Sequence, residues 1–337
     1  MFSVAKRVLF ALDPETAHNA TLSMLHLGRR LGVLATTPLT SSGKITLAGL
    51  SFPNRVGLAG GMDKNGVLLD SWAHFGFGFA ELGTVTPRPQ SGNEKPRMFR
   101  LLPDQAIINR MGFNNLGIEH LVEQFKKRNH NGFILGANLG KNKVTANEDA
   151  EADYIEGMRK LYLYADYFTI NISSPNTPGL RELQDAHRIK SLVHTLCMVR
   201  DELPIKRPVF IKLDPDTDST DLPYILEAIL QAGADGIIAT NTTTHRPNQL
   251  KSPQAKQAGG LSGEPLFEIA LKRVAEIRAF TGSGFPLMGV GGINSVQRGQ
   301  HMLEAGADLI QVYSGFVFKG PTLIKDLALS LPKTKTS

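Results

Sequence analysis

The sequence predicts an α/β protein, a single (β/α)8 TIM barrel preceded by a short N-terminal helical segment. From about residue 52 onward, eight short apolar or β-branched runs alternate with segments of helical period, which is typical of a parallel sheet with crossover helices. Polar and glycine-rich residues follow each run directly, where a barrel builds its active site. The length of 337 residues accommodates a barrel of about 250 residues and an accessory piece.

The eight runs predict the barrel strands, and a plausible helix follows each of them. Because the count reaches eight, a closed barrel is favoured over an open doubly wound sheet. The predicted strands are residues 55–59, 79–84, 133–139, 167–172, 209–213, 236–241, 286–290 and 309–313.

Two insertions interrupt the repeat. Residues 86–115 open with several prolines and then run through the extended segment 98–101, so we expect a small excursion over the barrel mouth. Residues 242–265 are polar and rich in glycine, which favours a second lid.

The first 45 residues lie outside the repeat, so we divide the chain into a helical segment, 1–45, and a barrel, 46–337. Asp13 and Pro14 predict a helix start, and we expect helices over 4–11 and 14–31. This segment is either a hairpin packed on the barrel or a surface pair that dips into anionic lipid. The residues behind these alternatives are the apolar Val4, Val8, Leu9, Leu12, Leu22, Met24, Leu25, Leu27 and Leu31 and the basic Lys6, Arg7, Arg29 and Arg30.

Composition excludes several classes of protein. The single cysteine, Cys197, cannot form an intramolecular disulfide, and no Cys/His spacing suits a metal, so we expect a metal-free site. The basic residues behind the net charge of +6 are dispersed and lack aromatic neighbours, which argues against nucleic acid as a partner. The sequence has neither an apolar run of 18 residues nor a signal peptide, so we expect a cytoplasmic protein that touches a membrane.

Glycine pairs and one lysine mark the ends of three strands. Gly291-Gly292 and Ser314-Gly315 follow the last two strands, where barrels commonly bind phosphate, although a tight turn is the alternative. Lys212 ends the fifth strand and requires an anionic partner there. That partner is either a reduced flavin or a carboxylate, Asp214 or Asp235.

Four asparagines, Asn109, Asn171, Asn176 and Asn241, offer amide donors and acceptors. Singly, each is more often a turn residue. Together with Lys64, their amides suit a small planar anion rich in carbonyl and N–H groups, such as a pyrimidine carboxylate.

The most distinctive segment runs from Asn171 to Gly179, with two prolines that fix its path. With it, six further motifs resemble the dihydroorotate dehydrogenases, in their quinone-dependent, membrane-associated class 2, over about residues 12–325. The motifs are Gly61-Met62-Asp63-Lys64, Gly83-Thr84-Val85-Thr86-Pro87-Arg88-Pro89-Gln90, Asn109-Arg110-Met111-Gly112-Phe113-Asn114-Asn115, Ala239-Thr240-Asn241-Thr242-Thr243, Gly259-Gly260-Leu261-Ser262-Gly263 and Gly289-Val290-Gly291-Gly292-Ile293.

The resemblance implies oxidation of (S)-dihydroorotate to orotate in pyrimidine biosynthesis, with FMN as redox group. It makes Ser174 the catalytic base, where class 1 relatives carry cysteine, and Thr177 and a water near Phe113 are candidate relay partners. It places substrate contacts at Lys64, Asn109, Arg110, Met111, Gly112, Phe113, Asn171, Asn176, Asn241 and Thr242. It places FMN contacts at Gly60, Gly61, Met62, Asp63, Lys64, Thr84, Asn138, Asn171, Lys212, Thr240, Gly263, Gly292, Tyr313 and Ser314.

The resemblance also implies a tunnel for a membrane quinone between the N-terminal helices and the barrel. His18 and Arg100 match the family's residues at its polar end. It further implies a monomer that binds peripherally to the cytoplasmic face of the inner membrane.

Two other readings remain open. Another FMN barrel, such as a dihydrouridine synthase or a reductase like dihydropyrimidine dehydrogenase, shares the Gly-Gly turn, but it requires an RNA-binding domain or a cysteine acid. A phosphosugar-binding barrel or an inactive binding module leaves the Ser174 loop without a use. Yellow colour on purification separates the flavoproteins from the rest.

Overall fold

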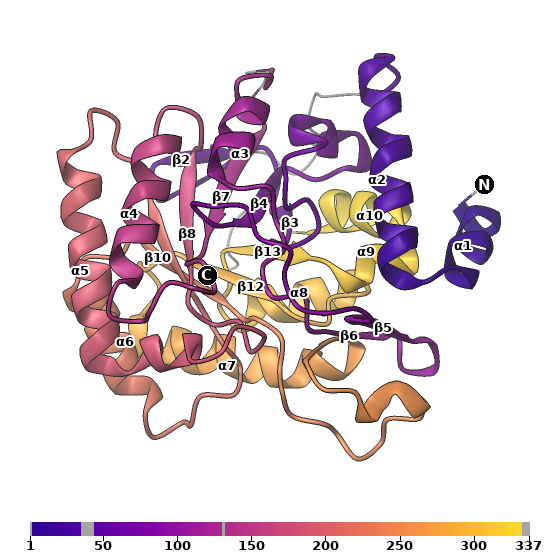
Figure 1. Cartoon of the computed structure of the whole chain (residues 1–337). Helices are drawn as coiled ribbons and strands as arrows, with labels where there is room; N and C mark the ends of the chain where they lie inside the picture. Colours follow the sequence, from indigo (N-terminus) through magenta and orange to yellow (C-terminus); the bar gives the residue numbers. More distant parts are fainter. Residues whose placement is uncertain (1, 35–43, 130–131, 332–337) are drawn as a thin grey trace.

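A closed barrel of eight parallel strands forms the centre of the molecule, as a computed structural model shows for residues 2–34, 44–129 and 132–331 (Figure 1). Consecutive barrel strands are neighbours in space, and the last pairs with the first. The eight predicted strands are confirmed, with ends shifted by at most two residues. They are β3 (Val56–Leu58), β4 (Phe79–Val85), β7 (Ile134–Leu139), β8 (Tyr167–Asn171), β9 (Val209–Leu213), β10 (Gly236–Ala239), β12 (Leu287–Val290) and β13 (Leu309–Val312).

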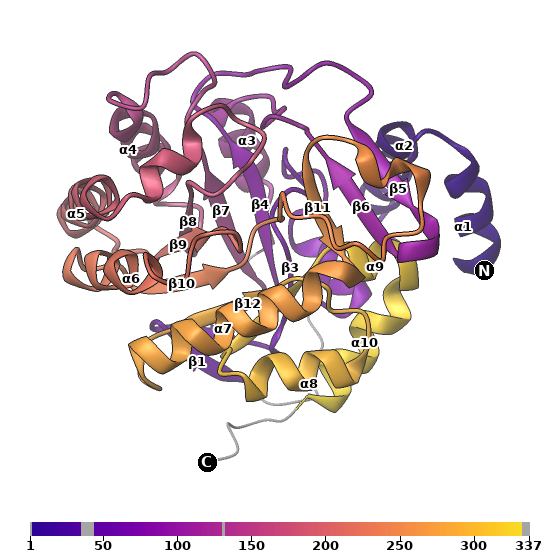
Figure 2. The ribbon, with the colours of Figure 1, turned by 90° about the horizontal axis from the view of Figure 1, so that it is seen from below.

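Helices surround this barrel, as the view from below shows (Figure 2). The expectation that a helix follows every strand holds except after β3, where the chain forms only the 3-10 segment Leu69–Phe75. Cys197 is buried in α5, where burial raises the pKa of its thiol to about 11. The helices are α3 (Ile118–Phe125), α4 (Ala150–Leu161), α5 (Ala186–Glu202), α6 (Leu222–Gln231), α7 (Phe267–Thr281), α8 (Val296–Glu304), α9 (Ser314–Lys319) and α10 (Pro321–Ser330).

Side chains fill the barrel interior in two layers, because inward-pointing residues recur at every second position of a strand. The layer nearer the amino-terminal ends of the strands is apolar, and its aromatic rings occupy the space left by glycines on neighbouring strands. A Cβ added at Gly136 would lie 2.1 Å from the Tyr167 ring, and one at Gly57 would lie 2.2 Å from the Phe79 ring. The second layer, two residues further along the strands, is polar. It consists of the buried residues Glu81, Thr169, Lys212 and Gln311.

A hairpin that the sequence did not predict closes the barrel at the amino-terminal ends of its strands. It consists of β1 (Ile45–Leu47) and β2 (Leu50–Phe52), joined by a two-residue turn in which Ala48 and Gly49 both have positive φ. Phe52 is fully buried against the apolar layer and meets the Phe79 ring edge to face, with centroids 5.1 Å apart. The hairpin therefore shields the apolar layer of the barrel from water.

The two insertions combine into one antiparallel sheet over the barrel mouth. The first contributes β5 (Met98–Leu101) and β6 (Ala106–Asn109), and the second contributes β11 (Gly260–Gly263), which pairs with β6. The excursion expected for 86–115 is confirmed. The second insertion is more than a separate lid, because its end is a strand of the same sheet.

The N-terminal helices α1 (Phe2–Ala11) and α2 (Pro14–Arg30) are confirmed as predicted, and both lie beside β5 and α9 (Figure 1). The Asp13 side chain accepts a hydrogen bond from the Thr16 N–H at 2.9 Å and so caps α2. Leu22 and Leu25 pack against the core, whereas Met24, Leu27 and Leu31 are exposed. The segment thus packs on the barrel, as the first alternative states, and it also presents exposed apolar side chains. The predicted contribution of the Val4 side chain lies outside the described residues.

Candidate active site

A deep cavity opens at the carboxyl ends of the barrel strands, and β6 and β11 line one of its walls. It encloses about 1050 Å³ including its open mouth, at the upper end of the range for small-molecule sites. Most of the predicted site residues line it. These are Gly60, Gly61, Lys64, Thr84, Asn109, Met111, Gly112, Phe113, Asn171, Ser174, Asn176, Lys212, Thr240, Asn241, Thr242, Gly263, Gly292, Tyr313 and Ser314.

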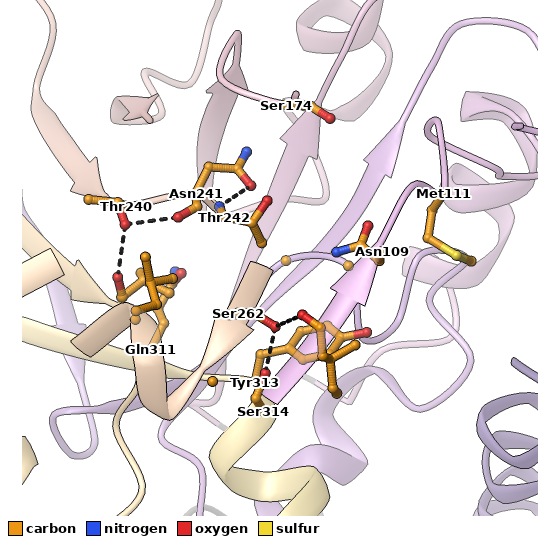
Figure 3. A pocket seen from close by; sticks show the side chains of 18 of the residues that line it. Asn109, Met111, Ser174, Thr240, Asn241, Thr242, Ser262, Gln311, Tyr313 and Ser314 are labelled. Atoms are coloured by element: carbon orange, nitrogen blue, oxygen red, sulfur yellow. Dashed lines mark hydrogen bonds between the residues drawn. The ribbon is translucent and has the colours of Figure 1, made fainter. Parts of the chain in front are cut away.

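The four asparagines meet in this cavity although they come from three separate segments of the chain. The Asn241 amide donates to Asn171 Oδ1 at 3.2 Å, and the Asn176 amide donates to Asn109 Oδ1 at 3.2 Å. These bonds fix the plane of each amide. Asn109 and Asn241 project toward a common space in Figure 3, so the pairs offer a preset pattern of donors and acceptors.

Ser174 lies at the edge of the cavity on the loop after β8 (Figure 3). Its Oγ accepts a hydrogen bond from the Asn176 N–H at 3.3 Å, and its own proton has no acceptor among the described residues. Thr177, three residues on, has a buried hydroxyl that likewise lacks a partner in the described chain. A buried hydroxyl without a partner indicates an ordered water or a ligand nearby.

Lys64 presents a cation to the cavity, and no described residue forms a hydrogen bond or ion pair with its ammonium group. Burial lowers the pKa of Lys64 to about 8, although the nearby Glu15 carboxylate opposes this shift. An anion bound in the cavity would supply the missing partner.

Lys212 lies on the cavity floor, where its ammonium group is 3.2 Å from Glu81 Oε1. Burial raises the pKa of the Glu81 carboxyl, but Lys212 and three hydrogen bonds outweigh burial and hold the pKa below its usual value. The carboxylates that the sequence suggested for Lys212 have other partners. Asp214 binds Gln184, and Asp235 pairs with Arg200.

Gly292 forms the far end of the cavity with a left-handed backbone, φ +65°. A Cβ there would lie 2.7 Å from the Phe267 backbone nitrogen, so only glycine fits. Its N–H group takes no hydrogen bond within the described chain. Beside it, the Ser314 and Ser262 hydroxyls lie 2.8 Å apart (Figure 3). A free backbone N–H next to hydroxyl groups suits an anionic group such as phosphate.

Four of the residues predicted to contact substrate or FMN do not line the cavity. Asp63 is fully buried and accepts hydrogen bonds from the Val67 and Leu68 N–H groups and the Trp72 indole, which organises the loop after β3. Asn138 lies below the cavity and donates to Glu81 at 2.6 Å. The remaining two are Met62, which is buried, and Arg110, whose guanidinium stacks on the Phe99 ring at 4.7 Å and bonds Gln257.

Sequence reasoning missed three polar residues of the site, Glu81, Gln311 and Ser262. Glu81 and Gln311 each stand alone within an apolar strand, which is itself a signal, since a buried polar side chain needs partners. The Gln311 amide donates to Glu81 at 2.9 Å. Ser262 had no local signal, because its strand joins the site only through pairing with β6.

Comparison with known sequences identifies this arrangement. A sequence profile described as dihydroorotate dehydrogenase matches residues 42–334. The chain belongs to the dihydroorotate dehydrogenase family. It is 45% identical over 338 residues to a dihydroorotate dehydrogenase (quinone) of Marinobacter nauticus, covering 99% of each chain. It is 46% identical over 332 residues to that of Nitrosospira multiformis, covering 97% of this chain and 95% of the relative.

Solved structures agree with this assignment. The structure of DHODH from Eimeria tenella in complex with ferulenol superimposes with a TM-score of 0.87 at 34% identity, over 95% of this chain and 93% of that one. A ligand-free structure from the same organism gives a TM-score of 0.86 at 35% identity, over 94% and 93%. The predicted barrel and the class 2 resemblance are therefore confirmed, and this dihydroorotate dehydrogenase family member is an oxidoreductase from a family of flavoproteins.

The two residues matched to the family's quinone site lie where the N-terminal helices α1 and α2 pack on the barrel. His18 on α2 contacts the Met62 carbonyl, and burial, together with the nearby Lys64 cation, lowers its pKa to about 3, so its imidazole is neutral. Arg100 on β5 donates to the Leu9 carbonyl at 3.0 Å and to that of Leu12, and it stacks over Phe10 at 4.8 Å. Arg100 thus holds the end of α1, and the two residues share no contact.

Within residues 2–34, 44–129 and 132–331, no helix has the length and apolar character needed to cross a bilayer. The same residues contain no group of His, Cys, Asp and Glu side chains arranged to hold a metal ion.

Proposed function

We propose that this chain oxidises (S)-dihydroorotate to orotate in pyrimidine biosynthesis, with FMN as redox group and a membrane quinone as final electron acceptor. The observation that carries the proposal is the single cavity in which Ser174, two amide pairs, the partnerless Lys64 and the Gly292 turn meet. The quinone-named relatives at 43–46% identity support the electron acceptor.

The cavity residues fit FMN from end to end. The Gly292 N–H, with the Ser262 and Ser314 hydroxyls nearby, would hold the phosphate. Lys212 would lie beside the flavin ring, where its cation favours the reduced form, and Gly60, Gly61, Thr84, Thr240, Gly263 and Tyr313 would enclose the rest. FMN held by these residues would supply the hydride acceptor and a redox group that quinone can reoxidise. Asn138, Asp63 and Met62 support this site from behind without lining it.

The substrate side lies between the asparagine pairs and the segment from Asn109 to Phe113. The Lys64 ammonium would pair with the substrate carboxylate, since it has no other partner. The four amides match the carbonyl and N–H groups of the ring, and Thr242 borders them. Arg110, predicted as a substrate contact, would act indirectly, through its hydrogen bonds to Gln257 and the Ala258 carbonyl.

Ser174 would remove a proton from one ring carbon while the hydride leaves the adjacent carbon, which creates the new double bond. A free serine hydroxyl is a weak base. The buried Thr177 hydroxyl without a partner supports a water-mediated path for the serine proton.

The N-terminal segment, 1–45, would bind quinone and the membrane, and residues 46–337 would form the FMN barrel. An apolar cluster of Phe10, Met98, Met111, Val317 and Phe318 lies between α1 and the barrel and offers a path for an apolar molecule. His18 and Arg100 would border it. We further propose peripheral attachment of a monomer to the cytoplasmic face of the inner membrane.

The test mixes the purified yellow protein anaerobically with dihydroorotate and follows bleaching of the flavin band. We expect bleaching by dihydroorotate and recovery with a ubiquinone analogue but not with fumarate. The Ser174→Ala variant should keep its FMN and bleach more than about a hundred-fold more slowly. No bleaching of the parent protein refutes the substrate, recovery with fumarate refutes the acceptor, and unchanged bleaching in Ser174→Ala refutes the base.

A further inference from the structure

A buried ion pair connects α2 to the loop ahead of β5. Glu15, in the first turn of α2, is 6% exposed, and Arg97 is equally buried. Arg97 Nε and Nη2 donate to the two carboxylate oxygens of Glu15 at 3.0 and 2.7 Å. Such a two-point pair fixes both orientation and distance, so α2 and the start of β5 are held as one unit.

The third guanidinium nitrogen and the backbone carbonyl of Arg97 organise the loop of residues 91–97. Its Nη1 donates to the Ser91 carbonyl at 2.6 Å and the Asn93 carbonyl at 2.7 Å. Its own carbonyl accepts the Arg110 N–H at 2.8 Å. No lysine can make these contacts together with the pair to Glu15, because they need the planar fork of the guanidinium.

Asn93 carries the connection into the substrate site. Its amide donates to the Asn176 carbonyl at 3.0 Å and to the Arg110 carbonyl at 3.1 Å. Its N–H donates to the Met111 carbonyl at 3.0 Å. Asn93 therefore ties the Ser174–Gly179 loop to the strand segment that faces it across the cavity.

Close packing makes this connection stiff. A Cβ at Gly112 would lie 2.7 Å from Asn93 Cγ, and one at Gly92 would lie 2.3 Å from the Met111 carbonyl oxygen. Both glycines have positive φ, so the loop has no room to take another path.

Glu15 and Arg97 also act on Lys64 through their charges, in opposite directions. Four charged or titratable groups face the Lys64 ammonium: Glu15 and His18 from α2, Arg97 from the loop, and Asp63 from its own segment. The Glu15 carboxylate raises the pKa of Lys64, and the Arg97 guanidinium lowers it.

We propose that Glu15 and Arg97 are positioning residues for the substrate. Through Asn93 they set the spacing of the Ser174–Gly179 loop from the Asn109–Phe113 segment, and from the other side the Glu15 carboxylate favours the charged form of Lys64. Docking of the N-terminal helix is thereby linked to substrate affinity, without either residue lining the cavity. This inference rests on the proposed function, because orotate is the ligand that reports it.

The first measurement is the orotate Kd, followed by the change in flavin absorbance, in the full-length FMN-loaded protein. Glu15→Gln and Arg97→Met should each raise Kd about ten-fold or more while FMN content stays that of the parent. In the double variant the two effects should not add, since they break one connection. Arg97→Lys keeps the charge and serves if Arg97→Met fails to fold; it should show an intermediate loss.

Arg200→Met is the matched control, because it breaks a similar ion pair, with Asp235 at 2.6 Å, at a site that does not line the cavity. It should leave the orotate Kd within two-fold. A parent protein that holds flavin but does not bind orotate fails the proposed function, and that result is seen before any variant is made. If the Kd values of the variants stay within two-fold of the parent, the positioning role is refuted and the proposed function stands.

The pH dependence separates positioning from general loosening. Orotate affinity in the parent should fall as pH rises through the pKa of Lys64, about 8, because the ammonium loses its proton. The midpoint should move to lower pH in Glu15→Gln, which removes a carboxylate, and to higher pH in Arg97→Met, which removes a cation. A midpoint that stays fixed in both variants overturns the proposed action on Lys64.

Discussion

At the residue scale, the barrel interior holds a buried charged pair at the floor of the cavity. Glu81 is fully buried, and Lys212, Asn138, Thr169 and Gln311 together satisfy its carboxylate. Removing one member of a buried pair leaves the other charge uncompensated, which costs more than the pair itself contributes.

We expect Glu81→Gln to lower the free energy of unfolding by about 3 kcal/mol, because Lys212 loses its counter-charge in a dry site. Urea unfolding at neutral pH measures this loss. Adding Lys212→Met should recover part of it, since no unpaired charge then remains.

Thr169→Val is the control for the Glu81 network. It removes a neutral donor at 3.0 Å from Glu81 Oε2 and should cost about 1 kcal/mol. A Glu81→Gln variant no less stable than Thr169→Val contradicts the importance of the ion pair.

Sequence analysis finds Lys212, but the carboxylates that it offers as one alternative partner, Asp214 and Asp235, are wrong for a clear reason. Asp214 is two residues away in the sequence, whereas Glu81 is on the strand β4, which is not even a neighbour of β9 in the barrel. The two side chains meet only because they point to a common axis. A single strand reveals which residues point inward, but not which of them share a layer.

At the element scale, aromatic rings fill the apolar layer of the barrel by packing against glycines of neighbouring strands. Gly136→Ala should lower the free energy of unfolding by about 2 kcal/mol or more, because its Cβ would overlap the Tyr167 ring. Thermal unfolding measures the change. Gly284→Ala, where nothing lies within 4 Å of the added Cβ, is the control and should remain close to the parent; equal effects of the two substitutions contradict the packing argument.

The elements that the sequence predicted are those with local signals. Barrel strands and helices carry periodicity and caps, so their positions were predicted within a few residues. The hairpin β1–β2 lacks a Gly-rich or Asn-Gly turn of the usual kind, because Ala48 takes its first left-handed position. The pairing of β11 with β6 joins segments that the sequence separates by most of the barrel, and no local pattern records such pairing.

At the scale of the whole molecule, the exposed apolar side chains of α2 set one face apart. Met24, Leu27 and Leu31 are 59%, 58% and 68% exposed, and Arg30 beside Leu31 is also exposed, whereas Arg29 donates to the Lys127 carbonyl. Burial of such side chains contributes about 1.5 kcal/mol or more each.

Replacing Met24, Leu27 and Leu31 together by serine should therefore weaken sedimentation with anionic vesicles by more than about ten-fold. The orotate Kd should not change, because these side chains do not line the cavity. Tyr224→Ser, which removes a side chain that is 67% exposed on α6, is the control. Equal sedimentation of the triple variant and the parent argues against α2 as the membrane-facing element.

The sheet over the mouth has a consequence for how the protein comes into being. Its middle strand is made early in synthesis, while the partner that completes the cavity wall, and the last barrel strand with Tyr313 and Ser314, are made near the end. A nascent chain still on the ribosome therefore holds no finished pocket, since closing such long loops must precede it. Capture of a ligand in this cavity therefore requires a chain that has been synthesised through β13 and a barrel that has closed.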